Sequence, residues 1–393
     1  MGRTFAITRR MEPRDPDEEH RVSTPLELLV DLTFVVAVAQ ASASLHHALS
    51  VGHASSALRA YPVVFFGVWW AWMNFTWFAS AYDTDDAVYR VATLVQMAGI
   101  LVLAAGVPRA FVHHDFAVVV LGYVIMRIAL VFQWLRASRH SASAATARRY
   151  AVGIVVCQVG WIAMLGLSGA AQTAAVVVLI GLELLVPLVA ERSGATPWHP
   201  EHIAERYGLF TIIVLGESIL AATMGVQESL DRGQALGDLI TISAGGLLIV
   251  FSMWWIYFAH PGERVTSAAR DAFAATSRLA FLWGYGHYVV YASAAAVGAG
   301  IAVAVDRVGG DRHLSESGAG LALAIPVVVY LLATWAVHSL QPSPPIKRVA
   351  VPVACVLVLI AAFLPETTLL VGLVLAGLIA VMTVAMDRSA RTT

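Results

Sequence analysis

The chain of 393 residues is 59% hydrophobic and only 13% charged, and its formal net charge is −1 at pH 7. Soluble domains carry about 25% charged residues, so this composition excludes an ordinary soluble protein. It predicts an all-α polytopic membrane protein whose main partner is the lipid bilayer. A net charge so close to zero gives no indication of a nucleic-acid partner.

The first 22 residues differ from the rest because they are polar and carry charges of both signs. Arg9 and Arg10 precede an acidic stretch at 15–19. Segments with few apolar residues and many charges cannot bury enough surface to fold by themselves. We therefore expect residues 1–22 to form a disordered tail.

A series of apolar segments follows the tail. A helix that crosses a bilayer needs about 20 mostly apolar residues. Twelve stretches of roughly this length alternate with short polar loops. They are 25–47, 57–80, 88–108, 115–136, 149–168, 171–190, 204–225, 236–259, 272–303, 319–340, 348–364 and 367–386.

The distribution of positive charge between these segments predicts their orientation. An even number of crossings places both termini on one side of the membrane. That side carries 18 lysine and arginine residues and the other side carries five. Loops rich in positive charge stay in the cytoplasm. We therefore expect a multi-pass protein of the plasma membrane with both termini in the cytoplasm.

The two halves of the chain resemble each other. Aligning Glu27 on Glu205 also aligns Thr33 on Thr211, and a Trp-Trp pair occurs in both the second and the eighth segment. Similarity in the same order is typical of transporters built from repeats, although chance similarity among helices rich in leucine, valine and alanine is the alternative. The pattern predicts two six-helix repeats in parallel orientation. Their ranges are 23–192 and 203–388, with a linker at 193–202.

Two carboxylates open the first apolar segment. Glu27 and Asp31 are four residues apart and therefore share one face of a helix. Acids inside a bilayer-spanning helix are costly. They indicate either a site for a cation or proton, or a charge-paired lock between helices. The residues that we expect to meet at this end of the first repeat are Glu27, Asp31, Asn74, Asp83, Asp86 and Arg90.

The second half carries an acid at greater depth. Glu205 and Arg206 stand at the entrance of the seventh segment, and Glu217 lies about 18 Å further along the helix. In the ninth segment, His287 follows Arg278 at a similar depth. We expect Glu217 and His287 to pair near the bilayer centre as a proton relay or cation site. A neutral hydrogen-bonded pair that specifies helix packing is the alternative.

Other polar residues give weaker signals. Glu183 and Arg127 are either mutual partners or anchors at the lipid interface. The run Asp83-Thr84-Asp85-Asp86 resembles the aspartate-rich motifs by which membrane prenyltransferases hold magnesium diphosphate, so Asp83 and Asp86 are the candidate metal ligands. Those enzymes need a second such cluster, and the second half offers only Gly262-Glu263-Arg264. The sequence names no cofactor and no catalytic residue.

Three motifs together resemble one family, the bacterial low temperature requirement A family. They are the runs 24–35 (TPLELLVDLTFV), 82–86 (YDTDD) and 202–218 (HIAERYGLFTIIVLGES), and the resemblance extends over about residues 20–385. It implies an integral membrane protein named for growth at low temperature, without a settled biochemical activity. A six-helix unit duplicated in parallel is also similar, more remotely, to a two-repeat potassium-channel family. That family begins its repeat with Arg…Phe-Ser-Asp, and this chain has Glu27 and Asp31 there without the serine.

These observations favour an ion- or proton-coupled transporter or channel that uses intramembrane carboxylates. A structural or regulatory membrane protein needed for growth at low temperature is the first alternative. A metal-dependent membrane enzyme acting on lipid-like substrates is the second. Assembly into a homo-oligomer is compatible with each of them.

Overall fold

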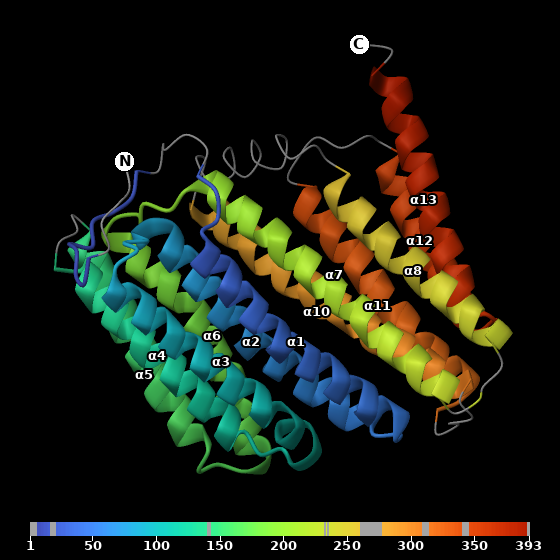
Figure 1. Ribbon diagram of the computed structural model, residues 1–393, viewed down its shortest axis with the longest axis horizontal. Coiled ribbons are helices and arrows are strands. Elements are labelled where there is room, and N and C mark those ends of the chain that lie inside the picture. The colour runs from blue at the N-terminus through green and yellow to red at the C-terminus, as the bar shows by residue number, and fades with distance from the viewer. Residues whose placement is uncertain are drawn as a thin grey trace. The chain divides into compact units, whose positions relative to one another are not determined.

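The structure is a computed structural model that describes residues 6–15, 21–139, 143–231, 233, 236–259, 277–308, 314–339 and 346–390. Within these ranges the chain forms helices and no strand (Figure 1). The helices are α1 (Pro25–Ser50), α2 (Ala54–Tyr82), α3 (Ala87–His113), α4 (Ala117–Ala137), α5 (Ala144–Met164), α6 (Gly169–Ala190), the short 3-10 helix η1 (Glu191–Ser193), α7 (Pro200–Asp231), α8 (Leu236–Phe258), α10 (Ser277–Val308), α11 (Glu316–His338), α12 (Lys347–Ala361) and α13 (Thr367–Ala390).

Each predicted apolar segment contains one of these α-helices, and their ends differ from the predicted ends by a few residues. In the described ranges, nine helices are long and apolar enough to cross a membrane. α12 has 15 residues and falls short of the usual length for a full crossing. The all-helical, multi-pass membrane architecture is therefore confirmed, whereas the exact number of crossings stays a prediction.

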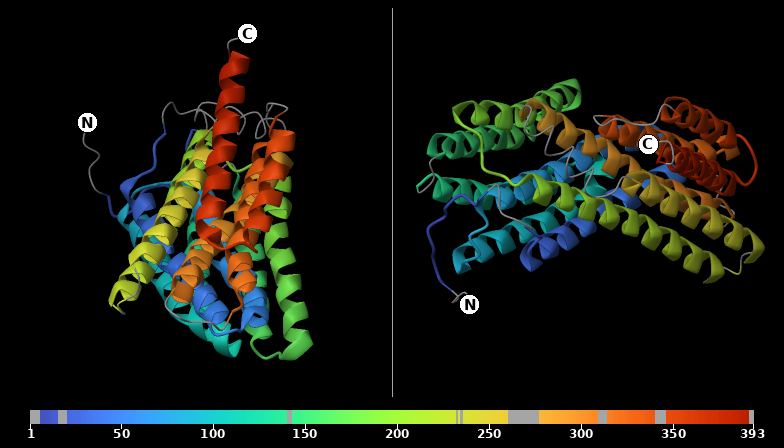
Figure 2. Two further views of the ribbon diagram at one scale, coloured as in Figure 1. Left: turned by 90° about the vertical axis from the view of Figure 1, so that its right-hand side faces the viewer. Right: turned by 90° about the horizontal axis from the view of Figure 1, so that it is seen from above.

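The helices divide into two compact units. The first contains Met1–Gln40 and Pro62–Arg206, and the second contains Ala41–Tyr61 and Tyr207–Thr393. In the first unit, α4 packs between α3 and α5, and α5 also contacts α6. In the second unit, α10 lies beside α11, and α13 contacts both α8 and α12 (Figures 1 and 2). The proposed repeat of six helices stays a prediction.

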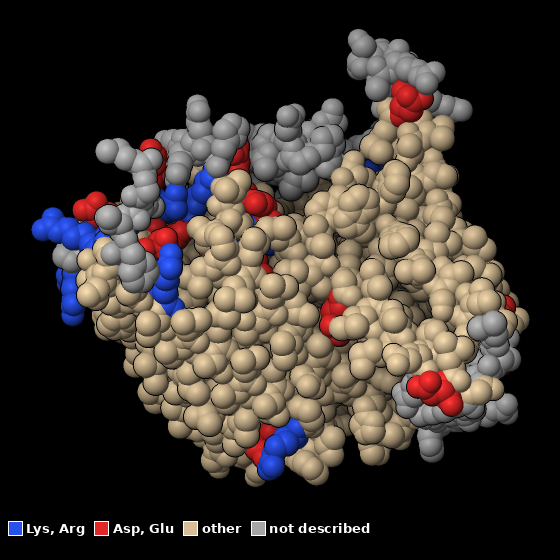
Figure 3. Space-filling model, viewed as in Figure 1, with Lys and Arg blue, Asp and Glu red and all other residues tan. Residues whose placement is uncertain are grey.

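The surface of the helices suits a lipid environment. Large apolar side chains such as Val152, Val156 and Val159 on α5 are about 60% exposed, at 63%, 60% and 62%. On the face in Figure 3, charged side chains gather mainly near the helix ends, and the broad area between those ends is almost free of them. An exposed apolar surface of this extent marks contact with a membrane.

The N-termini of α1 and α3 are capped by nearby side chains, and these caps include the acids Glu27 and Asp86. Thr24 and Glu27 form a capping box, in which the backbone amide of Thr24 donates to Glu27 Oε2 over 2.7 Å and the amide of Glu27 donates to Thr24 Oγ1 over 3.3 Å. At α3, Asp86 Oδ1 accepts from the backbone amide of Tyr89 over 2.8 Å. These caps hold both acids at the first turn of a helix, on the side of the membrane where the chain begins.

Glycines allow α3 and α4 to approach closely. A Cβ atom on Gly99 would lie 2.8 Å from the carbonyl oxygen of Gly122, and one on Gly122 would overlap the backbone of Leu103. Small residues at such a crossing permit the backbone contact that stabilises helix pairs in lipid. By contrast, a Cβ atom on Gly181 of α6 would meet nothing within 4 Å.

The substitution Gly122→Ala should therefore destabilise the first unit. The added methyl group must push α3 away from α4, and overpacking of this kind costs about 1–3 kcal/mol. We expect a lower midpoint of thermal unfolding in detergent, measured by loss of monodisperse protein. Gly181→Ala is the matched control and should keep the wild-type midpoint or raise it slightly, because alanine favours helix and the site is open. Equal midpoints for the two variants would contradict this account of the crossing.

Candidate functional site

Arg206 of α7 is fully buried against the two acids that open α1. Its Nη2 atom lies 2.6 Å from Asp31 Oδ1, and its Nη1 atom lies 3.4 Å from Glu27 Oε1. All three side chains are 1% exposed or less. The guanidinium group therefore bridges two carboxylates that the helical spacing of four residues had placed on one face.

Further donors complete this network. Trp72 Nε1 donates to Asp31 Oδ1 over 2.8 Å, and His202 Nε2 lies 3.2 Å from Glu27 Oε1. Arg21 Nη2 lies 3.9 Å from the same Glu27 oxygen and also donates to the carbonyl of Ala79 over 2.8 Å. Two buried arginines thus face two buried carboxylates. This balance of charge is what a lock between helices requires.

Some polar atoms of the network have no hydrogen-bond partner within the described part of the chain. Among them are Asp31 Oδ2, Arg206 Nε and His202 Nδ1. Unpaired buried polar atoms are costly and need a compensating contact such as a buried water molecule. The network is therefore paired in charge and incompletely paired in hydrogen bonds.

The other residues expected at this end form no hydrogen bond or ion pair with the network that the structure describes. Asp83 lies 3.5 Å from Arg14, and Arg90 Nε donates to Asp85 over 2.8 Å in an exposed pair. Asn74 Nδ2 donates to the carbonyl of Trp70 within its own helix. The six residues that the sequence grouped together therefore belong to several separate contacts. Helical spacing placed them at one depth but did not determine the direction in which each side chain points.

Asp86 forms the second buried ion pair of this unit, with Arg136 of α4. Arg136 Nη1 lies 3.1 Å from Asp86 Oδ1, and Arg136 Nη2 contacts the other carboxylate oxygen. The backbone amide of Arg9 also donates to Asp86 Oδ2 over 2.6 Å. Burial alone would raise the pKa of Asp86, but the hydrogen bonds from Arg136 and from the amides of Tyr89 and Arg9 hold that pKa below its usual range. Asp86 is thus an ionised anchor with its oxygens occupied.

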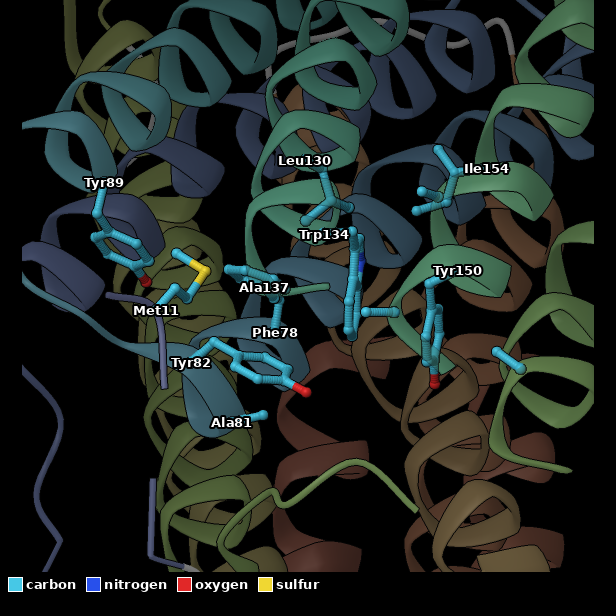
Figure 4. Close-up of a cluster of buried hydrophobic side chains, with 13 residues drawn as sticks. Met11, Phe78, Ala81, Tyr82, Tyr89, Leu130, Trp134, Ala137, Tyr150 and Ile154 are labelled. Atoms are coloured by element: carbon cyan, nitrogen blue, oxygen red, sulfur yellow. The ribbon is translucent and has the colours of Figure 1, made fainter. Parts of the chain in front are cut away.

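Residues 6–15 pack against the helices, which corrects the prediction of a disordered tail for this part of 1–22. Met11 is fully buried in a cluster with Phe78, Tyr82, Tyr89 and the stacked rings of Trp134 and Tyr150 (Figure 4). Arg136 Nη2 also donates to the carbonyl of Arg9 over 2.7 Å. One apolar side chain and a few backbone contacts are sufficient to fix a segment that its composition describes as unstructured.

Glu183 and Arg127 are mutual partners, 3.3 Å apart and both nearly fully buried. Glu183 also accepts hydrogen bonds from Trp70 Nε1 over 2.7 Å, Tyr123 Oη over 3.1 Å and Trp161 Nε1 over 3.2 Å. Both carboxylate oxygens are therefore paired. The alternative of an anchor at the lipid interface is wrong, since neither side chain reaches the surface.

Glu217 of α7 has a very different environment in the second unit. Glu217 is 7% exposed, and its Oε2 atom has no hydrogen-bond partner among the described residues. No arginine, lysine or histidine that the structure describes forms an ion pair with it. An unpaired buried carboxyl group cannot stay ionised without a counter-charge.

His287 does not pair with Glu217, contrary to our expectation. Its Nε2 atom is 2.9 Å from Tyr257 Oη, and its Nδ1 atom is 2.8 Å from the carbonyl of Trp283. The ring is fully buried and also packs against Tyr207. Both ring nitrogens are occupied by Tyr257 and Trp283, so neither the proton relay nor the neutral Glu217–His287 pair is formed. The side chain of Arg278 lies outside the described residues.

The sequence missed several members of these contacts. His202 precedes Arg206 by four residues, so the shared helix face was a usable signal. Arg21 lies in a polar segment, and Arg136 lies at the end of an apolar one, and neither position indicates an acidic partner. Glu205 is half-exposed beside Arg206. Among the residues that the structure describes, no group of three or more histidine, cysteine, aspartate or glutamate side chains could hold a metal ion.

Comparison with known proteins gives two matches. The family described as "Bacterial low temperature requirement A protein" matches the chain over residues 22–386. A protein of Rhizobium meliloti (strain 1021), described as uncharacterized, is 30% identical over 292 residues, which are 70% of this chain and 67% of that protein. The family match confirms the resemblance read from the sequence motifs, and its range includes all of the buried acids described above.

Replacing Arg206 by methionine should strongly destabilise the protein. The substitution keeps most of the volume but leaves Asp31 and Glu27 buried without their main counter-charge, a change that costs about 3–5 kcal/mol. We expect a large fall in the midpoint of thermal unfolding in detergent. The control is Arg109→Met, because the pair of Arg109 with Asp115 is exposed and screened by solvent. A midpoint for Arg206→Met close to that of Arg109→Met would show that the network does not hold the helices.

Asp83 should make stability depend on pH in a defined window. Burial raises the pKa of Asp83 from 3.8 to about 6, so the folded state binds this proton more tightly than the unfolded chain does. The stability contributed by this proton is complete below about pH 4 and is lost as the pH rises through 6. The total is about 3 kcal/mol for two pKa units.

Unfolding midpoints measured from pH 4 to 7 should test this dependence. Asp83→Asn should remove this component, so its midpoint should fall less than that of the wild type as the pH rises. Asp115→Asn is the control because the backbone amide of Ala117 and the side chain of Arg109 lower the pKa of Asp115, which titrates below this window. Parallel curves for the wild type and Asp83→Asn would refute the assignment.

Proposed function

This chain belongs to the bacterial low temperature requirement A family, and we propose that it moves protons or small monovalent cations across the plasma membrane. Glu217 is the ion-binding carboxyl group in this proposal. Both termini lie in the cytoplasm, as the distribution of positive charge predicts. The observation that carries the proposal is that no described residue supplies a counter-charge to Glu217.

Glu183 provides the comparison within the same protein. It is 1% exposed, and one arginine, two indoles and one phenol satisfy its two oxygens. Glu217 is 7% exposed and has no such partners among the described residues. A buried acid that serves structure is paired in this fold, whereas Glu217 is left available for a mobile partner.

The chemistry of a proton or cation site follows from this isolation. A carboxyl group removed from water stays neutral by keeping its proton or becomes an anion by binding a cation. If a proton and a cation replaced each other at Glu217, the movement of one across the membrane would be coupled to the movement of the other. Ionisable groups near the bilayer centre commonly mark such pathways. α7 brings the carboxyl group to this depth, because Glu217 lies 17 residues after the start of the helix, or about 26 Å.

The buried network of Glu27, Asp31 and Arg206 has a different role in this proposal. Its charges are already balanced, so it needs no further ion to be neutral. We assign it to holding α1, α2 and the start of α7 together. The carboxylates at 83, 85 and 86 contact Arg14, Arg90 and Arg136, which leaves the metal-dependent enzyme with little support.

The substitution Glu217→Gln should abolish transport while leaving the protein folded. Purified protein would be reconstituted in liposomes that contain pyranine for proton flux or a thallium-sensitive dye for monovalent cation flux. We expect the wild type to carry at least one of these ions and Glu217→Gln to reduce that flux by at least about tenfold. Asp115→Asn makes the same chemical change in an exposed loop and should keep the wild-type flux.

Two outcomes would contradict the proposal. One is normal flux in Glu217→Gln, with a monodisperse protein and a wild-type unfolding midpoint. The other is the absence of both fluxes in the wild type. In either case the charge-balanced network favours the structural or regulatory role, and Glu217→Gln should then fully restore growth of a cold-sensitive deletion strain.

A further inference from the structure

The second unit contains a cavity of about 150 Å³ whose lining reaches Ser218, the residue that follows Glu217. It lies between α7, α8 and α10. On α7 its lining extends from Val226 to Ser218, the residue that follows Glu217. These eight residues correspond to about 12 Å along the helix. The cavity therefore runs along the membrane-spanning part of α7 as far as the helical turn that carries Glu217, whose side chain is not part of the lining.

The hydroxyl groups in this cavity are suited to a cation. Ser218, Thr223 and Ser243 each donate their hydroxyl proton to a backbone carbonyl of their own helix, at Val214, Ile219 and Leu239. Each hydroxyl oxygen keeps lone pairs as an acceptor, while its proton is already used. A lining of this kind offers acceptors to a hydrated cation and few donors to an anion.

A second cavity of about 290 Å³ lies next to the first in the same unit. Ile242 of α8 lines both cavities. The second cavity is more polar and includes Arg307, Glu316 and Glu366. Arg307 Nη1 donates to the carbonyl of Leu314 over 2.6 Å, and the two carboxylates leave the lining with a net negative charge. A negatively charged mouth concentrates cations near it.

We propose that the two cavities form the access route of cations to Glu217 from the outer side of the membrane, with Ile242 as the gate. The role of Glu217 as the end of this route rests on the proposed function, but whether the route exists can be tested separately. α7 runs outward from the cytoplasm, so the cavity with Glu316 and Glu366 is the outer mouth. Ile242 packs with Leu239 and Val305 in a small apolar cluster, which separates the polar mouth from the inner cavity.

Access of water-soluble thiol reagents to single cysteines tests this route. The background is Cys157→Ala with Cys355→Ala, because both native cysteines are buried and free. Ser243→Cys and Ala222→Cys place a thiol in the inner cavity, because both residues line it and neither is exposed. Leu220→Cys is the matched control on α7, since Leu220 is 54% exposed and does not line the cavity. Two variants in the cavity protect the test against the failure of one of them to fold.

We expect a cationic thiosulfonate, added to proteoliposomes, to modify the two cavity cysteines at least about tenfold faster than Leu220→Cys, because only ionised thiols in contact with water react. An anionic thiosulfonate of similar size should react more slowly than the cationic one. Ile242→Trp should slow modification of the cavity cysteines, and Ile242→Ala should accelerate it. Equal rates at all three positions, or rates independent of residue 242, would overturn the route.

The two proposals fail in different ways. If the cavity cysteines are protected but Glu217→Gln abolishes flux, the ion reaches Glu217 by another path and only the route is wrong. If the cavity cysteines react and Ile242 controls their rate, but Glu217→Gln transports normally, the route exists and the role of Glu217 is wrong.

Discussion

The loss of water around buried charges is the constraint on which the rest of this structure depends. A carboxylate removed from water is unstable unless a counter-charge or a proton neutralises it. Asp31 and Glu27 meet this requirement through Arg206, Asp86 through Arg136, and Glu183 through Arg127. Each pair joins residues of different helices that are at least 50 residues apart in the sequence, so the same contacts that make the charges tolerable also fix which helices are neighbours.

Glu217 differs from these acids because no described side chain neutralises its carboxyl group. Its α7 neighbours are apolar or small, and no described side chain supplies a counter-charge. The difference between this acid and Glu183 separates two uses of a buried carboxyl group. One acid is fixed by its partners for the lifetime of the fold, whereas the other leaves its neutralising species to come from solution.

The sequence predicted the features that depend on local composition. Apolar length located all of the described α-helices, and the spacing of Thr24 and Glu27 contained the capping box. Partners were predicted poorly, because Asp31 and Arg206 are 175 residues apart and nothing local links them. Depth along a helix also suggested that Glu217 and His287 would meet, but depth does not determine the face, and His287 turns to Tyr257. The sequence therefore predicted which acids are buried, but it did not predict which residues they contact.

The attachment of residues 6–15 has a consequence for biosynthesis. The segment is synthesised before its partners, because its contacts are with Asp86, Ala81 and Arg136, which lie later in the chain. Met11 has no pocket until α2, α3 and α4 have been inserted and packed. Residues 6–15 can therefore dock only after α2, α3 and α4 have packed against one another.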